Sequence, residues 1–334
     1  MVDSPVHRRD AGMPTRSFVV KKIVNLVLAL FAIWTLNFFL FHMLPGDPTY
    51  ALLPARVDPN IIEDMRHKFG LDKPLLEQYF ISLLTTLKGD FGYSWFYKKS
   101  VLEVVSYRIQ YTLLLAGTGT ILSVLIGTYL GVVAGSNRGR ATDTAIVATS
   151  LSFYAMPAFW LGMVLLMVLA GQFKLFPLRG FEDVSATQRP FIEVLGDRIW
   201  HMILPVLTFV LTTISEFVLM MRNTLVDVLT EDYVTTARAK GLDPKAIVWR
   251  HAVPNALLPT AATTAMYIGW IVTGAIMIEV VFSWPGIGSL TWEALQKRDF
   301  PVLQCIFLVV TLAMLLANFF ADIIYTYLDP RVRM

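Results

Sequence analysis

Six long apolar runs constrain this chain more than any other feature. A helix that crosses a lipid bilayer needs about 20 mainly apolar residues, and its backbone must make all its hydrogen bonds internally. Runs of this length occur at residues 23–44, 110–134, 145–170, 199–221, 259–282 and 302–327. The sequence therefore predicts an all-α membrane protein with six transmembrane helices.

The composition agrees with a membrane protein and argues against several other classes. Hydrophobic residues make up 55% of the chain and charged residues 16%, whereas soluble domains have about 45–50% and about 25%. The net charge of +3 is too small to indicate a nucleic-acid-binding protein. The single cysteine, Cys305, allows no disulfide within the chain and no cysteine-based metal site. We expect membrane lipid around this chain, no nucleic acid and no metal.

Basic residues near the ends of the runs indicate which side of the membrane each end faces. Lys and Arg are enriched in short cytoplasmic segments, whereas long loops hardly follow this rule. With the N-terminus inside, the cytoplasmic segments carry 14 basic residues and the short outer segments carry six. The first run follows a basic start but no cleavage site comes after it, so it is interpreted as a retained helix. The prediction is N-in and C-in, with cytoplasmic tails at 1–22 and 329–334.

The segment 45–107 between the first two runs is too long for a simple turn. Helix-start and helix-stop signals predict a first helix near 58–70. Pro74 opens a second helix that reaches about Leu87, and a third amphipathic stretch follows near 98–109. We therefore expect a small helical extracytoplasmic segment. Two roles stay open for it: a lid that only packs on the helices, or a docking site for a soluble partner.

The segment 222–258, between the fourth and fifth runs, lies on the predicted cytoplasmic side. Its first part favours a helix, and Gly241 ends that helix in a conformation that costs glycine little. Asp243 then caps a new helix, with Pro244 at its first position and an end near Val253. The loop is therefore predicted to hold a short helix that lies across the membrane face.

The composition of this short helix allows two interpretations. It places apolar Ile247 and Trp249 beside the basic Arg250. A short rigid helix with such side chains suits a groove in a soluble partner. Amphipathic helices that lie on the membrane surface share the same composition. The residues alone leave both interpretations open.

The same loop resembles the signature of a known family. Permeases of bacterial ATP-binding-cassette (ABC) importers carry Glu-Ala-Ala, three residues, Gly, nine residues and then Ile-x-Leu-Pro. Aligned on Gly241, this pattern places its second alanine on Ala237 and its proline on Pro254. Two threonines replace Glu-Ala, and His251 and Val253 replace Ile and Leu. The wording DYVTTARAKGL and RHAVPNALLP is similar to the dipeptide/oligopeptide/nickel branch, the binding-protein-dependent type 1 permeases. Further stretches similar to that branch are LPGDP at 44–48, FGLDKPLLEQY at 69–79, GDFG at 89–92, FSWPGIG at 282–288 and DPRVR at 329–333.

This resemblance implies a division of labour between polypeptides. Residues 108–328 would form the type 1 core of five helices in a bacterial or archaeal cytoplasmic membrane. The chain would pair with a homologous permease, two ATPase subunits and an extracytoplasmic substrate-binding protein. It would bind no cofactor itself, because ATP and Mg²⁺ belong to the ATPases. The substrate would be short peptides; relatives that carry nickel, opines or oligosaccharides share these motifs and stay as alternatives.

The loop helix would then be the coupling helix, seated in a cleft of the ATPase. Motion of this helix would transmit nucleotide-driven closure to the membrane helices. The residues that the resemblance and the helix pattern assign to this coupling role are Ala237, Gly241, Asp243, Pro244, Ile247, Trp249, Arg250 and Pro254.

No sequence motif supplies chemistry of its own. The chain lacks the GxxxxGK[ST] phosphate loop and the HExxH and GxSxG motifs. A secondary transporter acting alone would show inverted repeats and a midplane ion site, and the sequence shows no convincing self-similarity. A membrane enzyme would need a nucleophile and base or metal ligands, but the five histidines are scattered. We predict a transport subunit without catalytic residues or an ATPase site.

Three carboxylates inside the runs are candidates for the transport path or for gating. Glu216 lies in the cytoplasmic third of the fourth run, Glu279 at the outer end of the fifth and Asp322 in the last third of the sixth. Ionisable residues within a membrane are costly and are functional candidates by default. The alternative is a satisfied hydrogen bond between helices, and we favour it for Glu279 and Asp322.

Small residues, prolines and tryptophans predict packing, breaks and anchors. Gly127, Gly131 and Gly135 share one helix face, which favours close helix packing over a pore. Pro157 and Pro205 would interrupt their helices. Three tryptophans are interpreted as anchors at the membrane interface: Trp200, Trp284 and Trp292.

Overall fold

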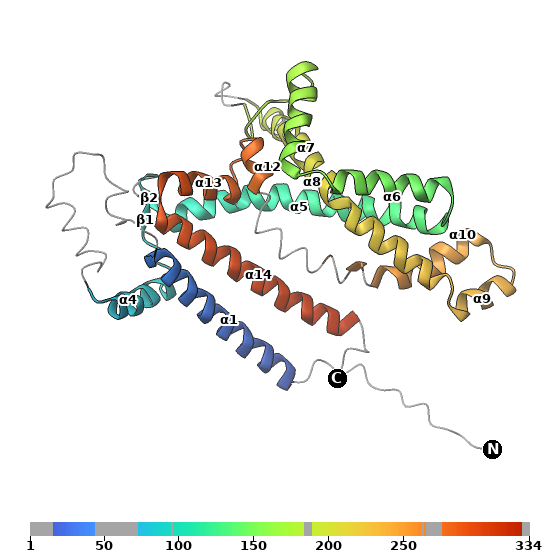
Figure 1. Ribbon diagram of the computed structural model, residues 1–334, viewed down its shortest axis with the longest axis horizontal. Coiled ribbons are helices and arrows are strands. Elements are labelled where there is room, and N and C mark those ends of the chain that lie inside the picture. The colour runs from blue at the N-terminus through green and yellow to red at the C-terminus, as the bar shows by residue number, and fades with distance from the viewer. Residues whose placement is uncertain are drawn as a thin grey trace.

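The computed structural model describes residues 16–43, 73–94, 96–183, 189–258, 260–261, 264 and 276–328. Within this part of the chain, the protein is helical except for one two-stranded hairpin (Figure 1). Each of its four long helices contains an apolar stretch that is long enough to cross a bilayer. They are α1 (Arg16–Met43), α5 (Val101–Ser136), α8 (Phe191–Val228) and α14 (Phe300–Leu328).

Shorter elements connect the long helices. The first group follows α1 and precedes α8: α4 (Leu75–Leu87), β1 (Tyr93–Ser94), β2 (Lys99–Ser100), α6 (Ala141–Tyr154), α7 (Ala158–Leu165) and the π-helix η1 (Leu166–Gln172). The second group lies between α8 and α14: α9 (Asp232–Ala239), α10 (Pro244–Ala246), the π-helix η2 (Ile247–Ala252), α12 (Ile276–Val281) and α13 (Ile287–Lys297).

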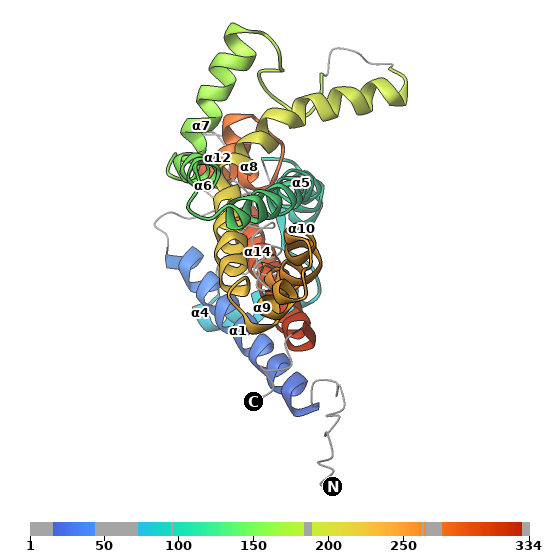
Figure 2. The ribbon, with the colours of Figure 1, turned by 90° about the vertical axis from the view of Figure 1, so that its right-hand side faces the viewer.

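The third predicted span is bent rather than straight. Helices α6 and α7–η1 meet at an angle of 98°, and Pro157 stands at the start of α7. This break was predicted, because proline removes a backbone donor and clashes with the preceding turn. Pro205 has no such effect, since α8 continues through it. Figure 2 shows α7 and the first part of α8 projecting away from the other helices in different directions.

The predicted number of spans is only partly supported. The described residues contain four candidate spans, or five if the bent pair counts as one. Most of the predicted span 259–282 lies outside the described residues, apart from its ends and α12. The chain is therefore an all-α, multi-span membrane protein, and six spans with N-in and C-in ends stay a prediction.

Helices α5 and α8 run parallel and form the centre of the structure. A Cβ added at Gly127 would lie 2.7 Å from the Phe217 Cβ, and one added at Gly131 would lie 2.7 Å from both the Met221 Cβ and the Val218 carbonyl oxygen. Such distances leave no room for a side chain. The predicted packing role of the glycine face is confirmed, because only glycine lets the two backbones approach this closely.

The two outermost long helices run antiparallel. The Asn37 amide of α1 donates to the Gln304 carbonyl of α14 over 3.1 Å, and the Phe41 ring lies 6.2 Å from the Phe300 ring. The first residues of α1 and the last of α14 therefore lie at one end of the molecule. Figure 1 shows α9 and α10 toward that end, and α4, the hairpin and α13 at the opposite end.

The described part of the segment 45–107 contains one of its predicted helices and a hairpin. The helix from Pro74 to Leu87 is confirmed as α4, and the predicted helix near 58–70 lies outside the described residues. The stretch 98–109 is not a separate helix. Ser100 pairs with Tyr93 in the hairpin, and the residues from Val101 onward belong to α5. The Ser100 hydroxyl caps α5 by accepting from the Glu103 amide over 3.3 Å.

Candidate functional site

Local hydrogen bonds that the sequence predicts shape the loop 222–258, although its predicted start is too early, because α8 continues to Val228. Gly241 has φ +73, and the Leu242 amide donates to the Ala237 carbonyl over 3.3 Å, so α9 ends in a left-handed turn. The Asp243 carboxylate then accepts from the Lys245 and Ala246 amides over 3.1 and 3.3 Å. The predicted helix stop and N-cap are both confirmed.

The helix after Asp243 is irregular and longer than predicted. Its first turn, Pro244–Ala246, is α-helical, and η2 follows as a π-helix. Residues 253–258 return to α-helix, so the predicted end near Val253 is wrong. The helix passes through Pro254, which has no backbone N–H to give to the residue four positions before it. A π turn just ahead of the proline accommodates this missing bond.

Burial divides the predicted coupling residues into two groups. Ala237 and Ile247 are buried against Val234 and Leu229, so their side chains face the protein and position the loop. The other six lie on the exposed surface of the loop: Gly241, Asp243, Pro244, Trp249, Arg250 and Pro254. Half of the Trp249 side chain is exposed, although its ring lies 6.5 Å from that of Tyr129 on α5. The loop thus presents an apolar and basic surface above a packed base.

Contacts below this surface join the loop to the long helices. Ala252, Val253 and Ala256 pack against Met221 and Leu225 of α8, with Val132 of α5 in the same cluster. The Asn255 amide donates to the Tyr233 hydroxyl over 3.0 Å and to the His251 carbonyl over 2.8 Å, which ties the two arms of the loop together. A displacement of the loop therefore reaches α5 and α8 directly.

Glu279 is a buried helix cap rather than an open carboxylate. Its carboxylate accepts from the Thr112 hydroxyl over 2.8 Å and from the Ser289 amide over 3.0 Å. Thr112 in turn accepts from the Ile287 amide over 2.7 Å. A carboxylate beside the first amides of α13 is also favoured by the helix dipole. These contacts support the alternative of a satisfied interhelical bond.

The FSWPGIG stretch is shaped around this carboxylate. A Cβ at Gly286 would lie 2.4 Å from the Glu279 carboxylate, and one at Gly288 would lie 2.5 Å from the Ile276 Cα. Trp284 is fully buried, and its indole N–H donates to the Tyr111 carbonyl over 2.9 Å. The interpretation of Trp284 as an interface anchor is therefore wrong. Trp200 and Trp292 are about half exposed, as anchors require.

Of the other two candidate carboxylates, only Glu216 has a described side chain. Glu216 lies half-buried on α8, and within the described residues its carboxylate has no hydrogen bond or ion pair. Asp322 belongs to α14, but its side chain lies outside the described part of the structure. Among the described side chains, Glu216 and Glu279 therefore share no contact partner, and the role of Asp322 stays a prediction.

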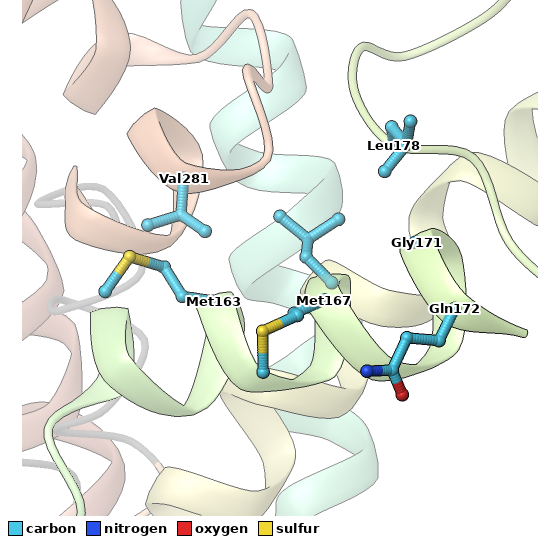
Figure 3. A pocket seen from close by; sticks show the side chains of 7 residues that line it. Met163, Met167, Gly171, Gln172, Leu178 and Val281 are labelled. Carbon is cyan, nitrogen blue, oxygen red and sulfur yellow. The ribbon is translucent and has the colours of Figure 1, made fainter. Parts of the chain in front are cut away.

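An open groove of about 570 Å³ lies between α7–η1, the loop after it and α12. Figure 3 shows Met163, Met167 and Val281 bordering it, with Gln172 further along the same helix. Methionines adapt to varied apolar shapes, but none of the described residues that line the groove is charged. This groove was not predicted, because its residues carry no periodic signal beyond that of an apolar run.

A polar cluster between the hairpin, α5 and α13, at the end of the molecule opposite α9 and α10, was also not predicted. Tyr97 and Arg108 donate to the same Glu293 oxygen over 2.5 and 3.3 Å. Burial raises the pKa of the Tyr97 hydroxyl, and the hydrogen bond to Glu293 adds to this effect. Burial also raises the pKa of the Asp299 carboxyl, although the Ser94 hydroxyl donates to it over 2.5 Å. These bonds fasten the hairpin to α13 and to the start of α14.

The sequence matches two family descriptions that together span most of the chain. Residues 127–334 match the binding-protein-dependent transport system inner membrane component, and residues 15–116 match the N-terminal part of such membrane components. The first match covers more than half of the chain. The chain belongs to this permease family. The resemblance found in the loop and the flanking motifs is thereby confirmed.

Individual relatives match this permease over almost its whole length. It is 33% identical over 331 residues to the di/tripeptide transport system permease protein DppB of Pseudomonas aeruginosa, which covers 95% of this chain and 98% of the relative. It is 32% identical over 317 residues to the glutathione transport system permease protein GsiC of Escherichia coli K12, with 95% and 99% covered. Both matches exclude a relationship limited to one domain.

A solved structure agrees with the fold. A chain of the inward-facing MetNI methionine ABC transporter superposes with a TM-score of 0.54 at 16% identity, covering 68% of this permease and 97% of that chain. Family membership makes the protein the membrane-spanning subunit of an ABC importer, with ATP hydrolysis on separate subunits. It is a multi-pass protein of the cytoplasmic membrane.

Proposed function

We propose that this permease and a second, homologous permease form the membrane path of an importer for short peptides. The names of the relatives support this substrate class, since one is a di/tripeptide permease and the other a glutathione permease. Glutathione is itself a tripeptide, so both names belong to one chemical class. An extracytoplasmic binding protein delivers the peptide, and the segment 45–107 is its docking site.

The exposed face of the loop 222–258 carries the proposal. Trp249 and Arg250 are exposed, while the residues beneath them pack on α8 and α5. We propose that each of two ATPase subunits binds such a loop, one on each permease. Closure of the ATPases then pushes the loop, and the packed base passes this motion to α5 and α8. Glu216 is proposed to face the path, because its carboxylate is half-buried without a partner among the described residues.

The test is ATP-dependent uptake of a radiolabelled dipeptide by the reconstituted importer with its binding protein. Gly241→Val and Arg250→Ala are expected to reduce uptake and the amount of ATPase that co-purifies with the permease. Arg179→Ala removes the same charge from an exposed position in a different loop and is expected to change neither. Uptake that persists in both loop variants without a bound ATPase would show that the loop does not couple the ATPases to transport.

A further inference from the structure

A pocket of about 500 Å³ lies beside the first turns of α5, at the end of the molecule opposite the loop 222–258. Tyr97, Tyr107 and Arg108 line it. Small-molecule sites usually measure about 300–1,000 Å³, and a dipeptide spans at most about 7 Å. The pocket is therefore large enough for a short peptide.

Arg108 is poorly matched to its protein partner. Its side chain is 18% exposed, and its one hydrogen bond within the described residues runs from Nη2 to the Glu293 Oε2 over 3.3 Å. Arg222, by comparison, donates from two nitrogens to Asp143 over 3.0 and 2.7 Å. Arginine presents five donors in a planar fork that fits a carboxylate with two bonds. Most donors of Arg108 therefore lack a protein acceptor in the described part of the chain.

The Glu293 carboxylate can also accept further hydrogen bonds. Tyr97 and Arg108 both donate to its Oε2, and within the described residues Oε1 has no partner. The Tyr111 hydroxyl donates to the Tyr107 oxygen over 3.0 Å, so the Tyr107 hydroxyl proton is available to another acceptor. The pocket thus offers free donors on Arg108 and Tyr107. Glu293 does not line the pocket, but it is bonded to Tyr97 and Arg108, which do, so its free acceptor lies beside these donors.

The charges of the pocket favour a ligand with both signs. Arg108 and Glu293 balance each other, and the exposed Lys99 and Glu103 at the rim are paired over 2.6 Å. A net anion such as phosphate would meet Glu293 at close range and be repelled. A zwitterion would instead meet an opposite charge at each end, and a free peptide is a zwitterion.

We propose that this pocket binds a short peptide by its termini, with the carboxylate on Arg108 and Tyr107 and the ammonium on the Oε1 of Glu293. The proposal rests on the peptide substrate proposed above. The peptide lengthens the weak contact between Arg108 and Glu293 and replaces it with two charge-assisted bonds. The pocket is then the first permease site that a released peptide meets.

The test measures equilibrium binding of radiolabelled alanyl-alanine to the permease–ATPase complex in nanodiscs, without the binding protein. Its C-terminal amide is the second probe. Wild type is expected to bind the free acid at least about tenfold more tightly than the amide, since a charge-assisted bond is lost. Arg108→Gln is expected to abolish that preference, Arg108→Lys to keep part of it, and Arg179→Gln to keep all of it. Melting temperatures of all variants are recorded.

Three results would overturn the proposal that the pocket binds a peptide by its termini. One is equal binding of the acid and the amide by wild type, and another is an unchanged preference in a folded Arg108→Gln complex. The third is displacement of the labelled dipeptide by inorganic phosphate as effective as its displacement by unlabelled dipeptide. If Arg108→Gln does not fold, the Arg108→Lys complex decides. If this complex prefers the acid over the amide as strongly as wild type does, peptide binding by Arg108 is refuted. Failure of wild type to import alanyl-alanine with its binding protein refutes the peptide function instead, so the two failures are distinguishable.

Discussion

Arg222 donates two hydrogen bonds to the Asp143 carboxylate, from Nε over 3.0 Å and from Nη2 over 2.7 Å. The Asp143 side chain is 5% exposed and also accepts from the Gly139 amide over 2.9 Å. Arg222 lies near the end of α8, and Asp143 lies in the first turn of α6. This pair therefore fixes the turn between α5 and α6 to the end of α8 that leads into the loop.

Arg222→Gln is expected to lower the stability of the purified permease by about 2–3 kcal/mol, because it leaves Asp143 buried and unpaired. Thermal unfolding of Arg222→Gln, Asp143→Asn and the double variant measures the coupling between the two residues. The double variant should be more stable than the sum of the single effects predicts. Strict additivity would show that the pair does not act as a unit.

Gly131→Ala is expected to destabilise the permease by about 1–3 kcal/mol, because the new methyl group would overlap Met221 and the Val218 carbonyl. Gly117→Ala is the matched control on the same helix, since no atom lies within 4 Å of its added Cβ. Melting temperatures of the two variants give the comparison. Equal effects would contradict the close packing of α5 on α8.

Glu279→Gln is expected to cost about 1–3 kcal/mol, because one acceptor oxygen becomes an amide group that faces the Thr112 hydroxyl or the Ser289 amide. Glu193→Gln, at an exposed position of α8, should change little. Melting temperatures again provide the measurement. A stable Glu279→Gln protein that fails in uptake would instead support the path role for Glu279.

Gly241→Ala is expected to lower the local stability of the turn by about 1–2 kcal/mol, because φ +73 is a left-handed conformation that alanine rarely adopts. Gly196→Ala provides the control, since both glycines have open space around the added Cβ and only Gly241 has the positive φ. Hydrogen exchange of the amides from 242 to 246 should accelerate in the first variant alone. Unchanged exchange would show that the turn tolerates alanine.

Asp299 is expected to make stability depend on pH. Burial raises the pKa of its carboxyl in the folded protein, so the folded state favours the protonated form. This contribution is complete below the ordinary pKa of aspartate, about 3.9, and is lost as pH rises through the raised pKa. Asp299→Asn should therefore gain stability relative to wild type as pH rises. A constant difference in melting temperature between pH 4 and about pH 7 would refute the shift.

The sequence alone determined the local features of this protein. Apolar run lengths predicted the long helices, and glycine spacing predicted the α5 face, because both depend on residues close together in the chain. The stop at Gly241 and the cap at Asp243 are likewise local backbone preferences. The spacing from Gly241 to Pro254, read as a family pattern, identified the permease.

Only the tertiary structure decided which polar groups meet. Glu279 and Thr112 are 167 positions apart, and Tyr97 and Glu293 are 196 apart, so no periodicity relates them. The same holds for the burial of Trp284 and of Ile247, which depends on neighbours that the chain brings back from elsewhere. A pattern in sequence reports the propensity of a segment, whereas a satisfied carboxylate or an unmatched arginine depends on the segments packed around it.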